Sequence, residues 1–219
     1  MNVARGLERK LERLLEGVFG RVFSGKLHPS EIATRVAREA DLARFDHASG
    51  PATANYITLT FHPKDISGET PELATSLTDS FADYVVEAGL RLIGPPHVTI
   101  KIDESVVPGQ FLCHLEVAPG EQRPWARLTG PEGTYQIRPN RAIVGRTTDA
   151  DVALQFDDVS REHALIWRSA GDTWIKDLGS SNGTTVDGTP LGAEPRAVDS
   201  GSSIKVSEHQ FRFVEIADA

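Results

Sequence analysis

The sequence predicts two domains, an α+β domain followed by an all-β sandwich. Helix-like and strand-like stretches alternate in the first half of the 219 residues, whereas only short strand-like runs follow from about residue 124. Apolar residues recur every three or four positions in the helix-like stretches and every second position in the strand-like ones. The two halves meet at a short stretch with proline and glycine. We therefore assign residues 1–118 to the first domain, 119–123 to a linker and 124–219 to the second domain.

The first domain has the predicted element order α-α-β-α-β-β. Helical spacing of apolar residues appears from Val3 to Phe19, after Pro29, and from Ile66 to Ile93, with Leu42 counted on the apolar side of the second helix. Strands are predicted at residues 56–61, 97–102 and 110–117, where apolar residues alternate. Cys113 falls on the apolar face of the last strand, so we expect a buried, unreactive thiol.

Three short runs stand out in the second domain, each between stretches that read as strands. They are Val144-Gly145-Arg146, then Asp158-Val-Ser-Arg-Glu-His-Ala164, then Asp177-Leu-Gly-Ser-Ser-Asn-Gly-Thr184. Loops fixed by a rigid sheet are common places for binding groups. Guanidinium, hydroxyl and amide N–H groups all donate hydrogen bonds to phosphate oxygens. The three runs therefore indicate a site for a tetrahedral oxyanion.

In order and spacing, the runs GR, SREHA and DLGSSNGTTVDG resemble a forkhead-associated (FHA) domain, a reader of phosphothreonine. The resemblance covers about residues 125–216. It implies that Arg146 and Ser160 bind the phosphate, that Arg161 and Ser181 flank it, and that Asn182 holds the peptide backbone. It further implies four loop-shaping residues, which are Gly145, His163, Gly183 and Thr184.

The first half resembles the N-terminal domain of the actinobacterial FhaA family, through HPSEIATRVAREAD, YITLTFHP and GPPHVTIKIDE…GQFLCHLEV. That resemblance implies a non-enzymatic adaptor in Ser/Thr kinase signalling. In such a setting a PknB-type kinase phosphorylates the pseudokinase region of the lipid II flippase, and the adaptor docks there and restrains peptidoglycan synthesis. The protein partner of residues 1–118 is left open.

Composition narrows the function classes. The formal net charge of −8 divides equally between the two halves, so neither resembles a basic nucleic-acid binder. The histidines show no metal-ligand spacing, and we expect no metal and no cofactor. The sequence contains a single cysteine and lacks any run of eighteen apolar residues. We therefore expect a cytoplasmic chain, recruited to the inner membrane face only through its partner.

Three alternatives stay open at this point. Ser160, His163 and Asp177 could be written as a Ser-His-Asp hydrolase set, although no G-x-S-x-G elbow surrounds the serine. The sandwich could assemble with its partner independently of phosphate, as a structural scaffold. The first domain could bind nucleic acid, since its outline loosely resembles a KH domain, but it lacks a GxxG loop in the right place.

Overall fold

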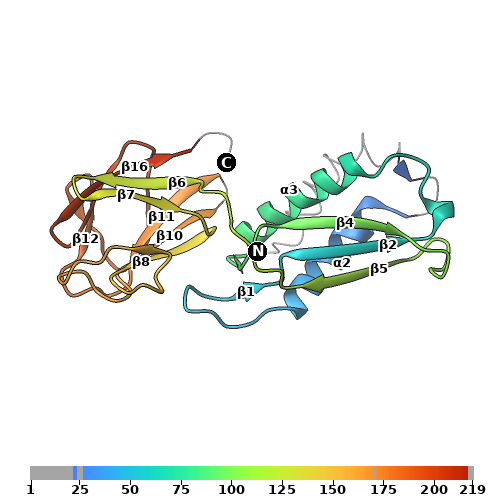
Figure 1. Cartoon of the computed structure of the whole chain (residues 1–219), viewed down its shortest axis with the longest axis horizontal. Coiled ribbons are helices and arrows are strands. Elements are labelled where there is room, and N and C mark those ends of the chain that lie inside the picture. Colours follow the sequence, from blue (N-terminus) through green and yellow to red (C-terminus); the bar gives the residue numbers. More distant parts are fainter. Residues whose placement is uncertain (1–21, 24–26, 170, 217–219) are drawn as a thin grey trace. The chain divides into compact units, whose positions relative to one another are not determined.

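The computed structural model describes residues 22–23, 27–169 and 171–216. It divides the chain into two units, residues 1–121 and 122–219. Each unit has its own layered core, an α+β unit and a β-sandwich, which confirms the predicted fold classes (Figure 1).

The first unit is a three-stranded sheet with two helices packed on one face. The strand order is β4-β2-β5, with β2 (Tyr56–Phe61) parallel to β4 (His97–Ile102) and antiparallel to β5 (Phe111–Glu116). Alternate residues Ile57, Leu59 and Phe61 of β2 are fully buried against the helices. The observed strands confirm the predicted strand positions. The alternation of buried and less buried residues is what a sheet covered on one face requires.

Helix α2 (Pro29–Leu42) begins where its sequence predicts. His28 precedes Pro29, and its imidazole accepts a hydrogen bond from the Ser30 N–H. The buried stripe is formed by Ile32, Ala33, Val36, Ala37 and Ala40. The placement of Leu42 on this apolar side was wrong, since it is 69% exposed. Two residues beyond Ala40, it is turned about 200° around the helix axis.

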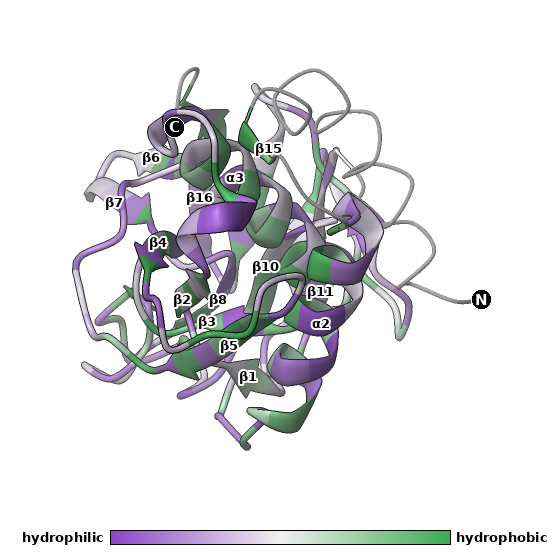
Figure 2. Cartoon of the chain, turned by 90° about the vertical axis from the view of Figure 1, so that its right-hand side faces the viewer, coloured by the Kyte–Doolittle hydropathy of each residue, from purple (hydrophilic) through white to green (hydrophobic). Residues whose placement is uncertain are grey.

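The third predicted helix is shorter than residues 66–93. Helix α3 spans Pro71–Glu87, after the 3-10 turn η1 (Pro63–Asp65). Gly89 lies at a φ of 68°, which ends the helix. The next two residues form β3 (Arg91–Leu92), parallel to β1 (Ala52–Thr53). Figure 2 shows apolar and polar residues on both α2 and α3, the pattern of helices covered on one side. The helix predicted from Val3 to Phe19 lies outside the described residues.

The second unit is a sandwich of two mainly antiparallel sheets. One sheet holds β13 (Thr189–Pro190), β12 (Thr184–Val186), β15 (Ser203–Val206), β16 (His209–Glu215), β6 (Ala126–Gly130) and β7 (Gly133–Ile137), in this order. The other holds β14 (Arg196–Ala197), β11 (Asp172–Asp177), β10 (Ala164–Ser169), β8 (Arg141–Gly145) and β9 (Val152–Ala153). The core between them includes Phe211, Phe213, Leu128 and Ile166.

Candidate functional site

Three connections of the sandwich come together at one end of the sheets. They are the β8–β9 loop, the β9–β10 loop and the β11–β12 loop. Hydrogen bonds join all three. The Arg146 N–H donates to the Ser160 carbonyl at 3.0 Å, and the Ser181 N–H donates to Ser160 Oγ at 3.0 Å. The sequence runs singled out above therefore form one surface.

Gly145 ends β8 and allows the loops to approach. A Cβ atom on this residue would lie 2.0 Å from the carbonyl oxygen of Arg161, a distance no side chain can adopt. Arg146 follows on the exposed surface, where its Nη1 donates to the carbonyl oxygen of Asp157 at 3.0 Å. A guanidinium has five donors, so most of them stay available to an anion. The glycine thus sets the backbone path and the arginine supplies charge.

Hydroxyl and amide groups complete this surface. Ser160 Oγ accepts the Ser181 N–H, so its own O–H can donate elsewhere. Asn182 Nδ2 donates to the Asp158 carbonyl at 2.7 Å, which fixes the side chain and leaves its amide oxygen as an acceptor. Arg161 and Ser181 are exposed beside them. A cation, a hydroxyl and an amide are therefore held by the same three loops.

His163 ties two of the loops together from inside. Its imidazole is fully buried, with Nδ1 accepting the Ser160 N–H at 3.2 Å and Nε2 donating to the Gly183 carbonyl at 3.0 Å. These two bonds fit the neutral ring protonated on Nε2. Gly183 lies at a φ of 79°, a conformation that suits glycine. The histidine thereby sets the spacing between Ser160 and the β11–β12 loop.

Asp177 organises the β11–β12 loop, a role that sequence reasoning missed. Its Oδ1 accepts the N–H groups of Gly179 and Ser180, while its Oδ2 accepts the hydroxyls of Ser180 and Thr184. Burial raises the pKa of this carboxyl, but the four hydrogen bonds outweigh burial and hold the pKa below its usual value. An aspartate directly before a Gly-Ser-Ser-Asn turn is the signal that could have identified it.

The Ser-His-Asp hydrolase interpretation does not match this geometry. The nitrogen of His163 nearest the serine bonds the Ser160 backbone N–H rather than accepting a proton from Oγ. Asp177 Oδ2 lies 3.9 Å from Nε2, and that nitrogen already donates to Gly183. A relay needs the carboxylate on one ring nitrogen and the serine hydroxyl on the other. The three side chains instead hold the loops in shape.

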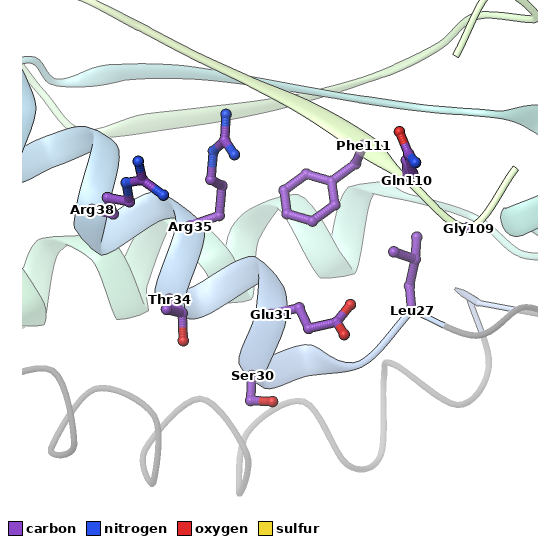
Figure 3. Close-up of a pocket in the computed structure, with 9 residues that line it drawn as sticks. All are labelled: Leu27, Ser30, Glu31, Thr34, Arg35, Arg38, Gly109, Gln110 and Phe111. Atoms are coloured by element: carbon purple, nitrogen blue, oxygen red, sulfur yellow. The ribbon is translucent and has the colours of Figure 1, made fainter. Parts of the chain in front are cut away.

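The first unit has a separate hollow of about 520 Å³ between α2 and the start of β5 (Figure 3). Its floor is apolar, with the Phe111 ring facing the helix, and two arginines line its side. Arg35 is paired with Glu39 at 2.8 Å, whereas Arg38, one turn further, is exposed. The remaining lining residues are Leu27, Ser30, Glu31, Thr34, Gly109 and Gln110.

Among the residues that the structure describes, no helix is long and apolar enough to cross a membrane. Within the same ranges, no three histidine, cysteine or carboxylate side chains are grouped as a metal site would need.

Comparison with known proteins explains both units. The family model for the N-terminal domain of FhaA matches residues 5–114, about half of the chain. The chain belongs to the FhaA family. The model for the FHA domain matches residues 142–207, which include all three loops, and the second unit of this FhaA-family chain is accordingly an FHA domain. The two resemblances inferred from the sequence are thereby confirmed.

The curated relatives match only part of this chain. The FHA domain-containing protein FhaA of Mycobacterium tuberculosis is 32% identical over 117 residues, which is 52% of this chain and 22% of that protein. The chain therefore spans about a fifth of the length of this relative. Mediator of DNA damage checkpoint protein 1 of Mus musculus is 36% identical over 69 residues, which is 31% of this chain and 4% of that protein.

Two solved FHA domains are each similar to part of this chain. One, from a study of phosphothreonine-dependent FHA domain interactions, is 29% identical and covers 42% of this chain and 97% of its own, with a TM-score of 0.38. Another is the FhaA FHA domain in complex with the intracellular domain of Rv3910. It is 30% identical and covers 42% of this chain and 99% of its own, with a TM-score of 0.37.

Proposed function

We propose that this chain is a phosphothreonine-dependent adaptor in Ser/Thr kinase signalling. The observation that supports this most is the convergence of Arg146, Ser160 and Asn182 on one surface, held there by bonds between the three loops. Phosphorylation of threonine adds a charge of about −1.5 to −2 and three strong acceptor oxygens. Arg146 supplies charge-assisted bonds to them, Ser160 supplies a short hydroxyl bond, and Asn182 engages the backbone of the bound peptide.

Arg161 and Ser181 border the same surface and add a second cation and a hydroxyl. Without the phosphate, these donors would face an unmodified peptide unpaired, at about 1–3 kcal/mol for each buried one. Binding in this proposal follows the action of a kinase and ends with that of a phosphatase. Gly145, His163, Gly183 and Thr184 shape the loops and do not themselves contact the phosphate.

The proposed partner belongs to the cell-wall machinery. The FhaA FHA domain has been solved with the intracellular domain of Rv3910, and membership of the same family supports a partner of that kind here. In this proposal, a PknB-type kinase phosphorylates the pseudokinase region of the lipid II flippase. The chain then docks there from the cytoplasm and restrains peptidoglycan synthesis at the inner membrane face.

Calorimetric titration of the full chain with phosphothreonine peptides tests the proposal. A pool with one phosphothreonine and randomised flanks is compared with the same pool carrying unmodified threonine. Arg146→Ala is expected to remove binding, whereas Arg127→Ala removes an equal charge from the exposed face of β6 and leaves binding unchanged. Equal affinity for the two pools would contradict the proposal and favour a phosphate-independent scaffold.

A further inference from the structure

The β9–β10 loop supports two of the proposed ligand residues through its backbone. Its Asp157 carbonyl accepts Arg146 Nη1, and its Asp158 carbonyl accepts Asn182 Nδ2. The Ser160 carbonyl accepts the Arg146 N–H in addition. A shift of this loop therefore moves the guanidinium and the amide together with Ser160.

The Asp158 carboxylate anchors this loop to the opposite sheet. It accepts hydrogen bonds from the Ser207 hydroxyl, from the Glu208 N–H at 3.4 Å and from His209 Nε2 at 2.9 Å. These partners belong to the turn between β15 and β16 and to the first residue of β16. The backbone of Asp158 thus holds Asn182 while its side chain holds the far sheet.

His209 is bound by two carboxylates and a ring. Its Nε2 meets Asp158, its Nδ1 lies 3.1 Å from Glu132 Oε1 in the β6–β7 turn, and its imidazole stacks on Phe156 with centroids 3.7 Å apart. Glu208, the turn residue directly before His209, is paired with Lys205 at 2.9 Å. Two carboxylates can both accept from an imidazole only when each ring nitrogen carries a proton.

The pKa values agree with this geometry. Burial lowers the pKa of His209, but its bonds to Asp158 and Glu132 outweigh burial and raise the pKa above the ordinary value. The bond from Ser207, followed by that from His209, holds the pKa of Asp158 far below its usual range. The bond from His209 also lowers the pKa of Glu132.

We propose that Glu132, His209 and Asp158 form a clamp that positions the phosphothreonine-binding loops, and that ligand affinity falls as His209 loses its proton. The inference rests on the proposed function and deepens it. His209 is a positioning residue, because it acts on the ligand groups through the β9–β10 loop and touches none of them directly. Glu132 and Asp158 share this role.

The direction of the effect follows from the proton count. A neutral imidazole has one N–H, so above the pKa of His209 only one carboxylate keeps its bond and the other faces a lone pair. The clamp is complete below about pH 6.5, the ordinary histidine value, and opens as the pH rises through the higher pKa of the folded chain. The second ionisation of the phosphate, near about pH 6, acts in the opposite direction and lies on the acid side of the His209 titration.

The test measures affinity against pH for the full chain and the tightest single phosphothreonine peptide from the pool. Wild type is expected to lose about threefold to tenfold in affinity between about pH 7 and about pH 9, the net scale of one ordinary hydrogen bond. His209→Gln cannot titrate and should give a flat profile over this range, with affinity already reduced at about pH 7. The matched control is His114→Gln, at an exposed position of β5, and its affinity should vary with pH as that of wild type does.

A second variant separates the clamp from a merely structural histidine. Glu132→Gln removes one carboxylate, so the fall in affinity should move to lower pH rather than disappear. A wild-type profile without this fall, or a His209→Gln profile that retains it, would overturn the inference while leaving phosphothreonine binding in place.

Nuclear magnetic resonance of the free chain distinguishes the two proposals. The Asn182 side-chain amide signal is expected to shift with the titration of the His209 ring, because Asp158 connects them. If no peptide binds wild type, the proposed function fails, and this coupling alone decides whether the clamp exists. An Asn182 signal that ignores His209 would refute the clamp.

Discussion

The side-chain amide of Asn182 donates to the backbone carbonyl of Asp158 at 2.7 Å, across two loops that are 24 residues apart in the chain. The same asparagine is proposed to engage the peptide, so one side chain both connects the loops and contacts the ligand. The two roles fall on different atoms of the amide: Nδ2 bonds the Asp158 carbonyl, and the amide oxygen stays available to the peptide.

Asn182→Asp tests this division of labour. The substitution keeps the acceptor but replaces the N–H₂ donor with a carboxylate oxygen, which would face the Asp158 carbonyl. We expect affinity for the phosphothreonine peptide to fall by at least about tenfold, the scale of a lost bond plus a new repulsion. Calorimetry gives the affinity, and a melting curve close to that of wild type would show that the fold persists. Undiminished binding would place the peptide elsewhere.

Gly145→Ala should destabilise the FHA unit. Its Cβ would fall 2.0 Å from the Arg161 carbonyl, so the backbone must move, at a cost of about 1–3 kcal/mol. Differential scanning calorimetry is expected to show a lower Tm for this unit. Gly192→Ala is the matched control, because nothing lies within 4 Å of the position its Cβ would take. Equal Tm values for the two variants would contradict the close approach.

Asp177→Asn should destabilise the β11–β12 loop in a pH-dependent manner. The pKa of Asp177 is lowered in the folded chain, so its contribution to stability is present above the unfolded value of 3.8 and is lost as the pH falls through the folded value. The difference in Tm between wild type and Asp177→Asn should therefore be large at about pH 7 and shrink toward about pH 3. A difference in Tm that does not vary with pH would contradict the claim that the ionised Asp177 carboxylate accepts four stabilising hydrogen bonds.

Cys113 should report unfolding of the first unit alone. Burial, followed by the charge of Glu39, raises the pKa of its thiol to about 12, so little thiolate exists near neutral pH. Alkylation by iodoacetamide at about pH 8 should be at least about a hundredfold slower in the native chain than in denaturant. Because it is the single cysteine, mass spectrometry reads the rate directly. Rapid native labelling would show that β5 opens easily.

Much of this architecture could be predicted from local patterns. The strands at residues 56–61 and 97–102 follow from strict alternation. The FHA loops follow from runs whose glycines are required by backbone geometry and whose serine and asparagine make side-chain hydrogen bonds. The two-residue strands β1 and β3 could not be predicted, because two residues carry no periodicity and their pairing is set by tertiary packing. Leu42 misled for a related reason, since a terminal apolar residue carries little phase information.

The residues that support the candidate site were harder to predict from the sequence than the residues proposed to bind the phosphopeptide. Asp177 and Asp158 act on loops through bonds to residues that follow them in the chain by 2 to 51 positions. The short-range bonds of Asp177 have a local signature, an aspartate before a turn. The bond between Asp158 and His209 has no local signature in the sequence. Folding of the sandwich alone brings the turn after β6 and the start of β16 to the β9–β10 loop.

Mapping a bound phosphothreonine peptide onto the backbone amides of the ¹⁵N-labelled full chain tests the central claim most directly. The largest shifts are expected at Arg146, Ser160 and Asn182, and the peptide with unmodified threonine should cause none. Shifts confined to residues 27–118, or identical shifts with both peptides, would contradict a phosphothreonine site at the loop end of the sandwich.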